Sequence, residues 1–134
     1  MSARTAACAC GQLRAICEGE PPLVALCDCT QCQRRTGSVY GVGAYFERER
    51  VKTEGAFKQF RRSSDAGRRL DLAFCPDCGS TVFWVLEMMP GRVGVAVGAF
   101  ADPDFPAPQV AVWTENKYRW VPLPEGVPAR PKQP

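Results

Sequence analysis

Short stretches in which apolar and polar residues alternate recur along the whole chain. The first runs from Leu13 to Glu18 and ends at Gly19 and the pair Pro21-Pro22. Alternation with a period of two is typical of strands that bury one face, and Gly and Pro close such strands with turns. Further strands are expected over residues 23–26, 38–46, 57–62, 70–74, 81–86, 92–97 and 110–113, with 81–86 and 92–97 forming a hairpin. With 12 Gly and 12 Pro among many branched and aromatic residues, the pattern predicts a mainly β fold.

One short helix is expected among these strands. The segment from Thr30 to Arg35 contains neither Gly nor Pro, begins with a Thr suited to the N-cap, and stops at Thr36-Gly37. Cysteines lie just before and inside this segment. A helix N-terminus lowers the pKa of nearby thiols through its free amides and its dipole, so the placement favours thiolates.

The length of 134 residues fits one domain, which we expect to span residues 1–120. Residues 121–134 contain five prolines. Because proline has no backbone donor, this tail is expected to be extended and its end loose.

The chain has no run of about 18 apolar residues, and no long apolar run follows Arg4, so the sequence predicts a soluble, cytoplasmic protein without a membrane partner. A reducing compartment favours metal binding or catalysis for the eight cysteines, with disulfides as the alternative.

The net charge of +3 is too small to indicate a nucleic-acid partner. Seven thiolates holding two zinc ions would bring that charge to zero. The sequence carries no signal for an oligomeric state.

Two cysteine pairs have the spacing of metal ligands. Cys8 and Cys10 are separated by one residue in a segment expected to be extended, where alternate side chains face the same side. The run Cys-Pro-Asp-Cys-Gly over residues 75–79 has the spacing, the stiffening Pro and the turn Gly of a zinc knuckle. Joining the two pairs gives a closed four-thiolate site, which would be structural.

Cys27, Cys29 and Cys32 then remain to hold a second zinc ion with one open position. That position would accept water or substrate, and the ion could hold a substrate thiolate or polarise an oxygen. In the alternative interpretation the fourth ligand is a protein group, Asp28 or a distant carboxylate, and both sites are structural.

Several other residues bear on chemistry. Cys17 stands alone in a strand pattern and is expected to be buried as a small apolar residue. The chain has no His, which excludes His-dependent acid–base catalysis and imidazole ligation. Arg34 and Arg35 follow the three cysteines and are candidates for binding a substrate carboxylate, with a solvated surface as the alternative.

Two features have a structural and a functional interpretation. Gly41 and Gly43 in a strand pattern favour a β-bulge over the close approach of a ligand. Met88 and Met89 favour packing over the mouth of a pocket.

The motifs taken in chain order point to a family. They are Cys8-x-Cys10-Gly11, Cys27-x-Cys29-x-x-Cys32 followed by Arg35-Thr36-Gly37-Ser38, Phe74-Cys75-x-x-Cys78-Gly79-Ser80, and Val97-Gly98-Ala99-Phe100-Ala101-Asp102-Pro103. Over nearly the whole chain this order resembles the glutathione-dependent formaldehyde-activating family, also called the GFA or CENP-V domain.

The resemblance implies an Mss4-like fold of small antiparallel sheets with one short helix, stapled by zinc. It implies a structural zinc at Cys8, Cys10, Cys75 and Cys78, and a second at Cys27, Cys29 and Cys32. In the type activity of the family, glutathione and formaldehyde condense to S-hydroxymethylglutathione, which is a carbon–sulfur lyase reaction in reverse. Asp28 stands where many relatives carry His.

We therefore expect a zinc-dependent carbon–sulfur lyase or thiol-adduct enzyme that acts on a glutathione-like thiol and a small aldehyde. Its catalytic group would comprise Cys27, Asp28, Cys29 and Cys32, and its substrate would be held by Arg34 and Arg35. The alternative hypothesis is a non-catalytic, zinc-stabilised binding module or thiol carrier.

Overall fold

The computed structural model describes residues 2–133. Within this range the chain forms ten strands, one α-helix and three short 3-10 helices. The strands are β1 (Ala3–Ala7), β2 (Arg14–Glu18), β3 (Leu23–Cys27), β4 (Gly41–Glu47), β5 (Val51–Glu54), β6 (Lys58–Ser63), β7 (Arg69–Phe74), β8 (Thr81–Leu86), β9 (Arg92–Ala96) and β10 (Val110–Val112). The helices are α1 (Thr30–Thr36), η1 (Arg48–Arg50), η2 (Val97–Phe100) and η3 (Thr114–Asn116). The predicted mainly β class with one short helix is confirmed.

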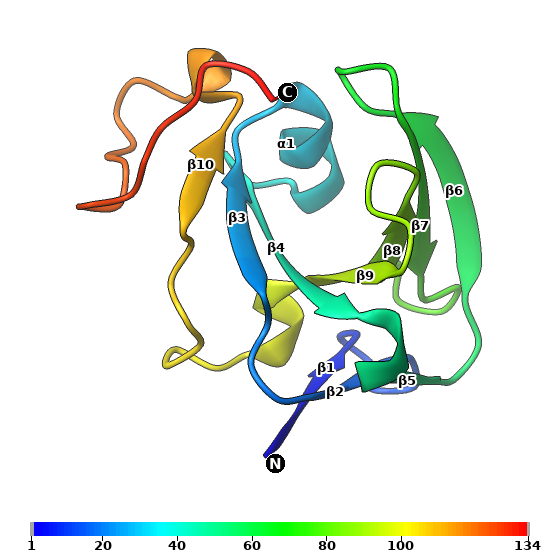
Figure 1. The fold of residues 1–134 in the computed structure, drawn as a ribbon. Helices are drawn as coiled ribbons and strands as arrows, with labels where there is room; N and C mark the ends of the chain where they lie inside the picture. The colour runs from blue at the N-terminus through cyan, green and yellow to red at the C-terminus, as the bar shows by residue number, and fades with distance from the viewer. Residues whose placement is uncertain (1, 134) are drawn as a thin grey trace.

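The strands form two sheets. A three-stranded sheet has the order β1-β2-β5, and a seven-stranded sheet has the order β10-β3-β4-β9-β8-β7-β6. Neighbouring strands are antiparallel except β10, which runs parallel to β3. The larger sheet curls into a trough: β10, β3 and β4 form one wall, β8, β7 and β6 form the other, and α1 lies between the walls (Figure 1). None of the helices within residues 2–133 is both long and apolar enough to cross a bilayer.

The convex face of the larger sheet carries the main hydrophobic core. Successive side chains of a strand point to opposite faces, and Val24, Phe46 and Val95 point away from the trough into this core. There they pack with Ala15 and Cys17 of the smaller sheet. Cys17 is fully buried, as predicted, and burial raises the pKa of its thiol to about 12. The main core therefore uses the convex face, whereas the concave face carries a smaller buried cluster around Trp84 and the site.

The floor of the trough is formed by Trp84, which lies across two glycines. A Cβ atom placed on Gly94 would come 2.2 Å from Trp84 Nε1, and one on Gly43 would come 2.8 Å from Cζ2 of the same indole. On Gly41 it would meet a guanidinium nitrogen of Arg35 at 2.7 Å. The registers of β4 with β3 and β9 are unbroken. The β-bulge prediction was therefore wrong, because these glycines make room for side chains above the sheet.

Two strands were missed by the pattern, and one segment has another conformation. The strands β1 and β5 pair on either side of β2. The segment containing Cys8 and Cys10 was expected to be extended, but it forms a turn in which Gly11 N donates to Cys8 O at 3.0 Å. The two sulfurs converge because the chain bends around them, not because alternate residues share a face.

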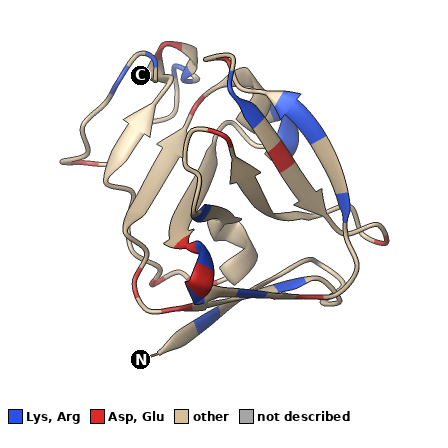
Figure 2. Ribbon diagram, turned by 45° about the vertical axis from the view of Figure 1, so that its right-hand side comes forward, with Lys and Arg blue, Asp and Glu red and all other residues tan. Residues whose placement is uncertain are grey.

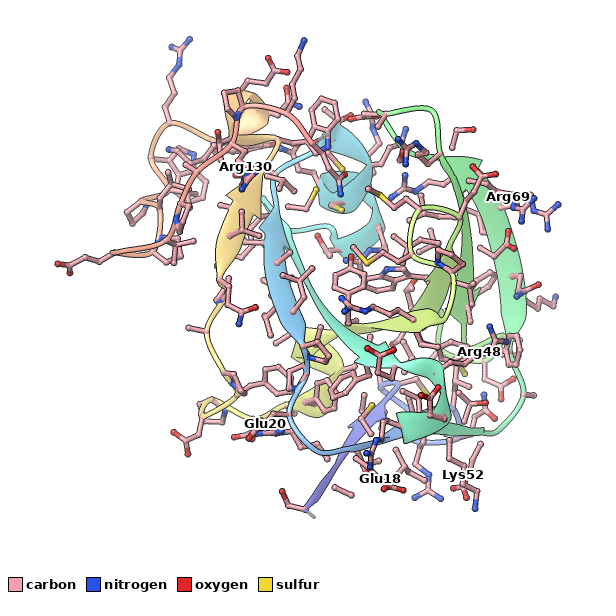
Figure 3. All side chains as sticks on the ribbon, viewed as in Figure 1. Glu18, Glu20, Arg48, Lys52, Arg69 and Arg130 are labelled. Carbon is pink, nitrogen blue, oxygen red and sulfur yellow. The ribbon has the colours of Figure 1, made fainter. Side chains whose placement is uncertain are left out.

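Within residues 121–133 the proline-rich tail combines extended segments with a turn at residues 125–126 and bends, and the prediction of a loose end concerns residue 134, which lies outside the described residues. Arg130 N donates to Ala111 O at 2.8 Å, and Ala111 N donates to Pro128 O at 2.9 Å, so the tail adds backbone hydrogen bonds along β10. Farther on, Trp113 Nε1 donates to Gln133 Oε1 at 3.4 Å. Arg130 lies on this tail beside β10 (Figure 3).

The contact between Trp84 and Gly94 gives a stability prediction. Gly94→Ala should lower the free energy of unfolding by about 1–3 kcal/mol, because the new methyl group overlaps a buried indole that cannot move without opening the floor. Urea denaturation followed by circular dichroism measures the change. Gly98→Ala is the matched control, because a Cβ there meets no atom within 4 Å and the expected change is below about 0.5 kcal/mol. Equal stability of the two variants would contradict the packing argument.

Candidate metal centres and the adjoining cavity

The first candidate metal centre lies where the two sheets meet. The sulfurs of Cys8, Cys10, Cys75 and Cys78 lie within 4.8 Å of one another. Two of the separations are 3.6 Å, between Cys8 and Cys10, and 3.7 Å, between Cys10 and Cys75. A tetrahedron with zinc–sulfur bonds of about 2.3 Å has edges of about 3.8 Å, so this sulfur set fits zinc.

Two similar turns hold these four sulfurs. Gly79 N donates to Cys75 O at 2.8 Å in one turn, which parallels the bond from Gly11 to Cys8 in the other. Gly11 and Gly79 have φ values of 84° and 80°, a region that favours glycine. The knuckle predicted at residues 75–79 thus has a counterpart in the turn from Cys8 to Gly11.

Hydrogen-bond donors lie against several of these sulfurs, whereas the neighbouring thiols raise the pKa of Cys10 to about 12. Leu13 N donates to Cys8 Sγ at 3.3 Å, and Gln12 Nε2 donates to Cys75 Sγ at 3.0 Å. The Ser80 side chain and nearby backbone amides lower the pKa of Cys78 to about 5. Because metal ligands must be thiolates, these donors prepare the site for a cation.

The second candidate metal centre lies at the open side of the trough. Cys27 ends β3, Cys29 precedes α1 and Cys32 lies in its first turn, and the three sulfurs lie within 4.8 Å of one another. Sulfur atoms gather beside α1 in Figure 3. The three sulfurs thus offer one ion a facial set of thiolates, consistent with zinc.

A cysteine sulfur caps the N-terminus of α1. Thr30 was expected to be the N-cap, but Cys29 occupies that position and its Sγ accepts a hydrogen bond from Cys32 N at 3.3 Å. Contacts from the Cys27 and Cys32 thiols lower the pKa of Cys29 to about 2. The Cys32 amide and the charge of Arg62 add to this effect, and burial opposes it. Cys29 is therefore a thiol of this group whose ionised form receives a hydrogen bond from the helix N-terminus.

Asp28 does not join the three sulfurs. Its side chain is 1% exposed and it lies outside both groups of candidate ligands. It does not line the cavity that Cys27 and Cys29 line, as expected when successive residues of an extended segment face opposite sides. Burial raises the pKa of its carboxyl, and the charge of Lys117 offsets part of that rise. Asp28 Oδ2 has no hydrogen-bond partner within residues 2–133.

A cavity of about 400 Å³ fills the trough, and the three sulfurs form part of its wall. Alternate residues of the large sheet line it, and so do residues of α1, the β6–β7 turn, the segment after β8, and the tail. Its apolar lining includes Leu23, Ala25, Leu70, Leu72, Trp84, Leu86, Met88, Met89, Val110, Val112 and Trp113. Met88 and Met89 both pack against the neighbouring core and line this cavity.

Only one of the two candidate arginines after the cysteines reaches this cavity. The Arg35 guanidinium lies over the Trp84 ring, 4.7 Å from its centroid, and lines the cavity. Arg34 lines a neighbouring cavity of about 310 Å³ and does not line the one with the sulfurs. Within residues 2–133, Arg35 forms no ion pair with a carboxylate.

Three further arginines line the cavity and were not identified as site residues from the sequence. They are Arg62, Arg68 and Arg130. Arg62 Nε is buried without a hydrogen-bond partner in the described part of the chain. Several Lys and Arg residues, including Arg62, lie along strand β6 (Figure 2). Alternation along β6 could have indicated that Arg61, which binds Asp71 at 2.7 Å, and Arg62 face opposite sides.

Comparison with known proteins agrees with this geometry. A sequence model of the family described as glutathione-dependent formaldehyde-activating enzyme matches residues 3–116. The chain belongs to this family. A search of curated proteins finds no match. Among solved structures, a Rhodobacter sphaeroides protein determined as a structural genomics target is similar, with a TM-score of 0.53, 21% sequence identity, and coverage of 71% of this chain and 85% of that chain. At this identity the similarity supports the fold alone.

Metal content tests the two centres of this family member. We expect two zinc ions per chain by mass spectrometry of the native protein. Cys29→Ser should remove about one ion and keep the fold, because three ligands at the edge of the trough do not join the sheets. Cys75→Ser should also remove one ion but lower the melting temperature strongly, because the four-thiolate site links both sheets.

Cys17→Ala is the matched control for these variants. It changes a buried cysteine outside both groups and should leave two zinc ions in place. Loss of both ions in Cys29→Ser would show that the two centres are not independent.

Proposed function

We propose that the protein is a zinc-dependent enzyme that forms or cleaves a carbon–sulfur bond between a glutathione-like thiol and a small aldehyde. The observation that carries this proposal is the group of three cysteine sulfurs in the wall of a cavity of about 400 Å³, without a fourth protein ligand among the described residues. A closed structural site would have no such access.

Cys27, Cys29 and Cys32 would hold the ion at the cavity wall. Bound there, zinc supplies a Lewis acid that favours the ionised form of a substrate thiol. The apolar walls exclude water from the reacting atoms, which strengthens each polar contact inside the cavity.

Arg35 binds and orients the substrate in this proposal. Its guanidinium carries a fixed charge, lies against Trp84, and has no carboxylate partner within residues 2–133, so a substrate carboxylate can take that place. Stacking on the indole restricts the side chain before substrate arrives. Less conformational entropy is then lost on binding.

Tyr45 is the candidate for moving a proton. Burial raises the pKa of its phenol to about 12, so the hydroxyl keeps its proton at neutral pH. Its Oη lies 3.1 Å from the position of a Cβ on Gly43, in the wall of the same cavity. From there the hydroxyl can donate to the oxygen of an aldehyde and recover the proton when the adduct breaks down.

Exchange spectroscopy with carbon-labelled formaldehyde and glutathione tests the reaction. The zinc-loaded protein should increase the rate of adduct formation and breakdown above the spontaneous rate. The Cys29→Ser variant should lose this increase. If no thiol and aldehyde pair reacts faster with the wild-type protein, the non-catalytic thiol-binding module becomes the better interpretation.

Arg35→Ala should raise KM for glutathione by about tenfold to a hundredfold and change kcat little, because it removes a charge-assisted contact to a part of the substrate that does not react. Arg34→Ala is the matched control: it removes the neighbouring charge outside the cavity and should leave KM unchanged. A larger effect of Arg34→Ala than of Arg35→Ala would refute the assignment.

A further inference from the structure

The cavity extends well beyond the three cysteines along an apolar floor. Leu23, Ala25 and Cys27 are alternate residues of β3 on one face, and four residues of a strand span about 13 Å. On the neighbouring strand β4, Gly41 and Gly43 lie opposite Cys27 and Ala25 and add no side chain to this floor. The side chains that β3 itself contributes beyond Cys27 are therefore apolar, while the polar groups above β4 are the Arg35 guanidinium over Gly41 and the Tyr45 hydroxyl over Gly43.

The facing wall is apolar as well. Leu70, Leu72 and Leu86 belong to a buried cluster with Trp84, and Met88 packs against it. All five side chains line the cavity. Polar groups enter from the end of β6, the β6–β7 turn and the tail, and also from Arg35, Tyr45 and Gln109. The facing wall thus presents hydrocarbon, indole and thioether groups, and the Gln133 amide reaches it at Met88, where Nε2 lies 3.6 Å from Sδ.

A one-carbon adduct of glutathione leaves much of this apolar lining unfilled. Formaldehyde contributes a single carbon, whereas the apolar surface continues for about 13 Å from Cys27 toward Leu23. The glutathione skeleton carries amides, carboxylates and an ammonium group, and burying such groups against apolar walls without hydrogen-bond partners is unfavourable. An apolar chain of several carbons would fill the same space and remove it from water.

We propose that the ligand of this cavity combines a sulfur atom held at the three cysteines, an anionic group held by the arginines, and an apolar chain several carbons long that lies along β3 toward Leu23, Leu86 and Met88. This inference rests on the proposed function for the sulfur atom alone. The apolar chain follows from the lining of the cavity.

Binding of two matched thiols to the zinc-loaded protein tests the inference. Mercaptoacetate and α-mercaptooctanoate share the thiol and the carboxylate and differ in a hexyl tail. Trp84 and Trp113 line the cavity, whereas Trp120 is 73% exposed, so tryptophan fluorescence in a Trp120→Phe background reports occupancy. We expect α-mercaptooctanoate to bind at least about a hundredfold more tightly, since each buried methylene contributes about fourfold.

Variants at Met88 locate the tail. Met88→Gln should weaken α-mercaptooctanoate about tenfold and change mercaptoacetate less than about twofold, because it places an amide against the chain. Met88→Leu keeps an apolar side chain and should retain the preference. If the wild-type protein binds both thiols equally, the apolar chain is wrong and the proposed function stands.

Octanoate separates the two proposals, because it has the tail and the carboxylate but no thiol. Binding of octanoate as tight as that of α-mercaptooctanoate would support the apolar chain and overturn the role of sulfur in the proposed function. If none of the three probes binds, both the proposed function and the proposed apolar chain are overturned.

Discussion

Four cysteine sulfurs meet at the junction of two sheets, two from the turn after β1 and two from the turn after β7. Ionised sulfurs separated by 3.6 to 3.7 Å repel one another strongly unless a cation lies between them. Backbone amides and Gln12 lower the cost of ionisation, but they do not supply a full positive charge. The junction between the sheets is therefore coupled to metal binding, and so is the packing of the convex face on the smaller sheet.

The concave face is free for chemistry because the main hydrophobic core lies on the other side of the same strands. Its floor is a stack in which Gly43 and Gly94 support the Trp84 indole, and the indole supports the Arg35 guanidinium. Each layer fixes the position of the next without a carboxylate. A salt bridge at Arg35 would have neutralised the charge. Stacking on an aromatic ring instead orients the cation and leaves its donors available.

Local spacing predicted the cysteine groups, because one or two residues between neighbouring ligands determine which sulfurs can share an ion. Most strands and the helix were also predictable from local signals, namely the alternation of apolar and polar residues and the residues that begin and end a helix. The orientation of Asp28 also follows from alternation after Cys27, although the sequence interpretation placed it with the catalytic group. Other features depend on contacts between distant segments, such as the parallel pairing of β10 with β3. The separation of Arg34 from Arg35 depends on how α1 is rotated in the trough, since adjacent helical residues point about 100° apart. Cys29 as N-cap was missed because a thiol sulfur takes the role usual for a hydroxyl.

The tail brings Arg130 and Gln133 to the cavity while contributing little to the hydrophobic core. It is held along β10 by a few backbone hydrogen bonds, and its prolines make it stiff without requiring a specific partner at each position. The two candidate metal centres and these two cavity-lining residues are thus supplied by different parts of the chain. Substitutions of the Arg130 and Gln133 side chains can therefore alter the cavity wall while the backbone hydrogen bonds along β10 and both cysteine groups stay in place.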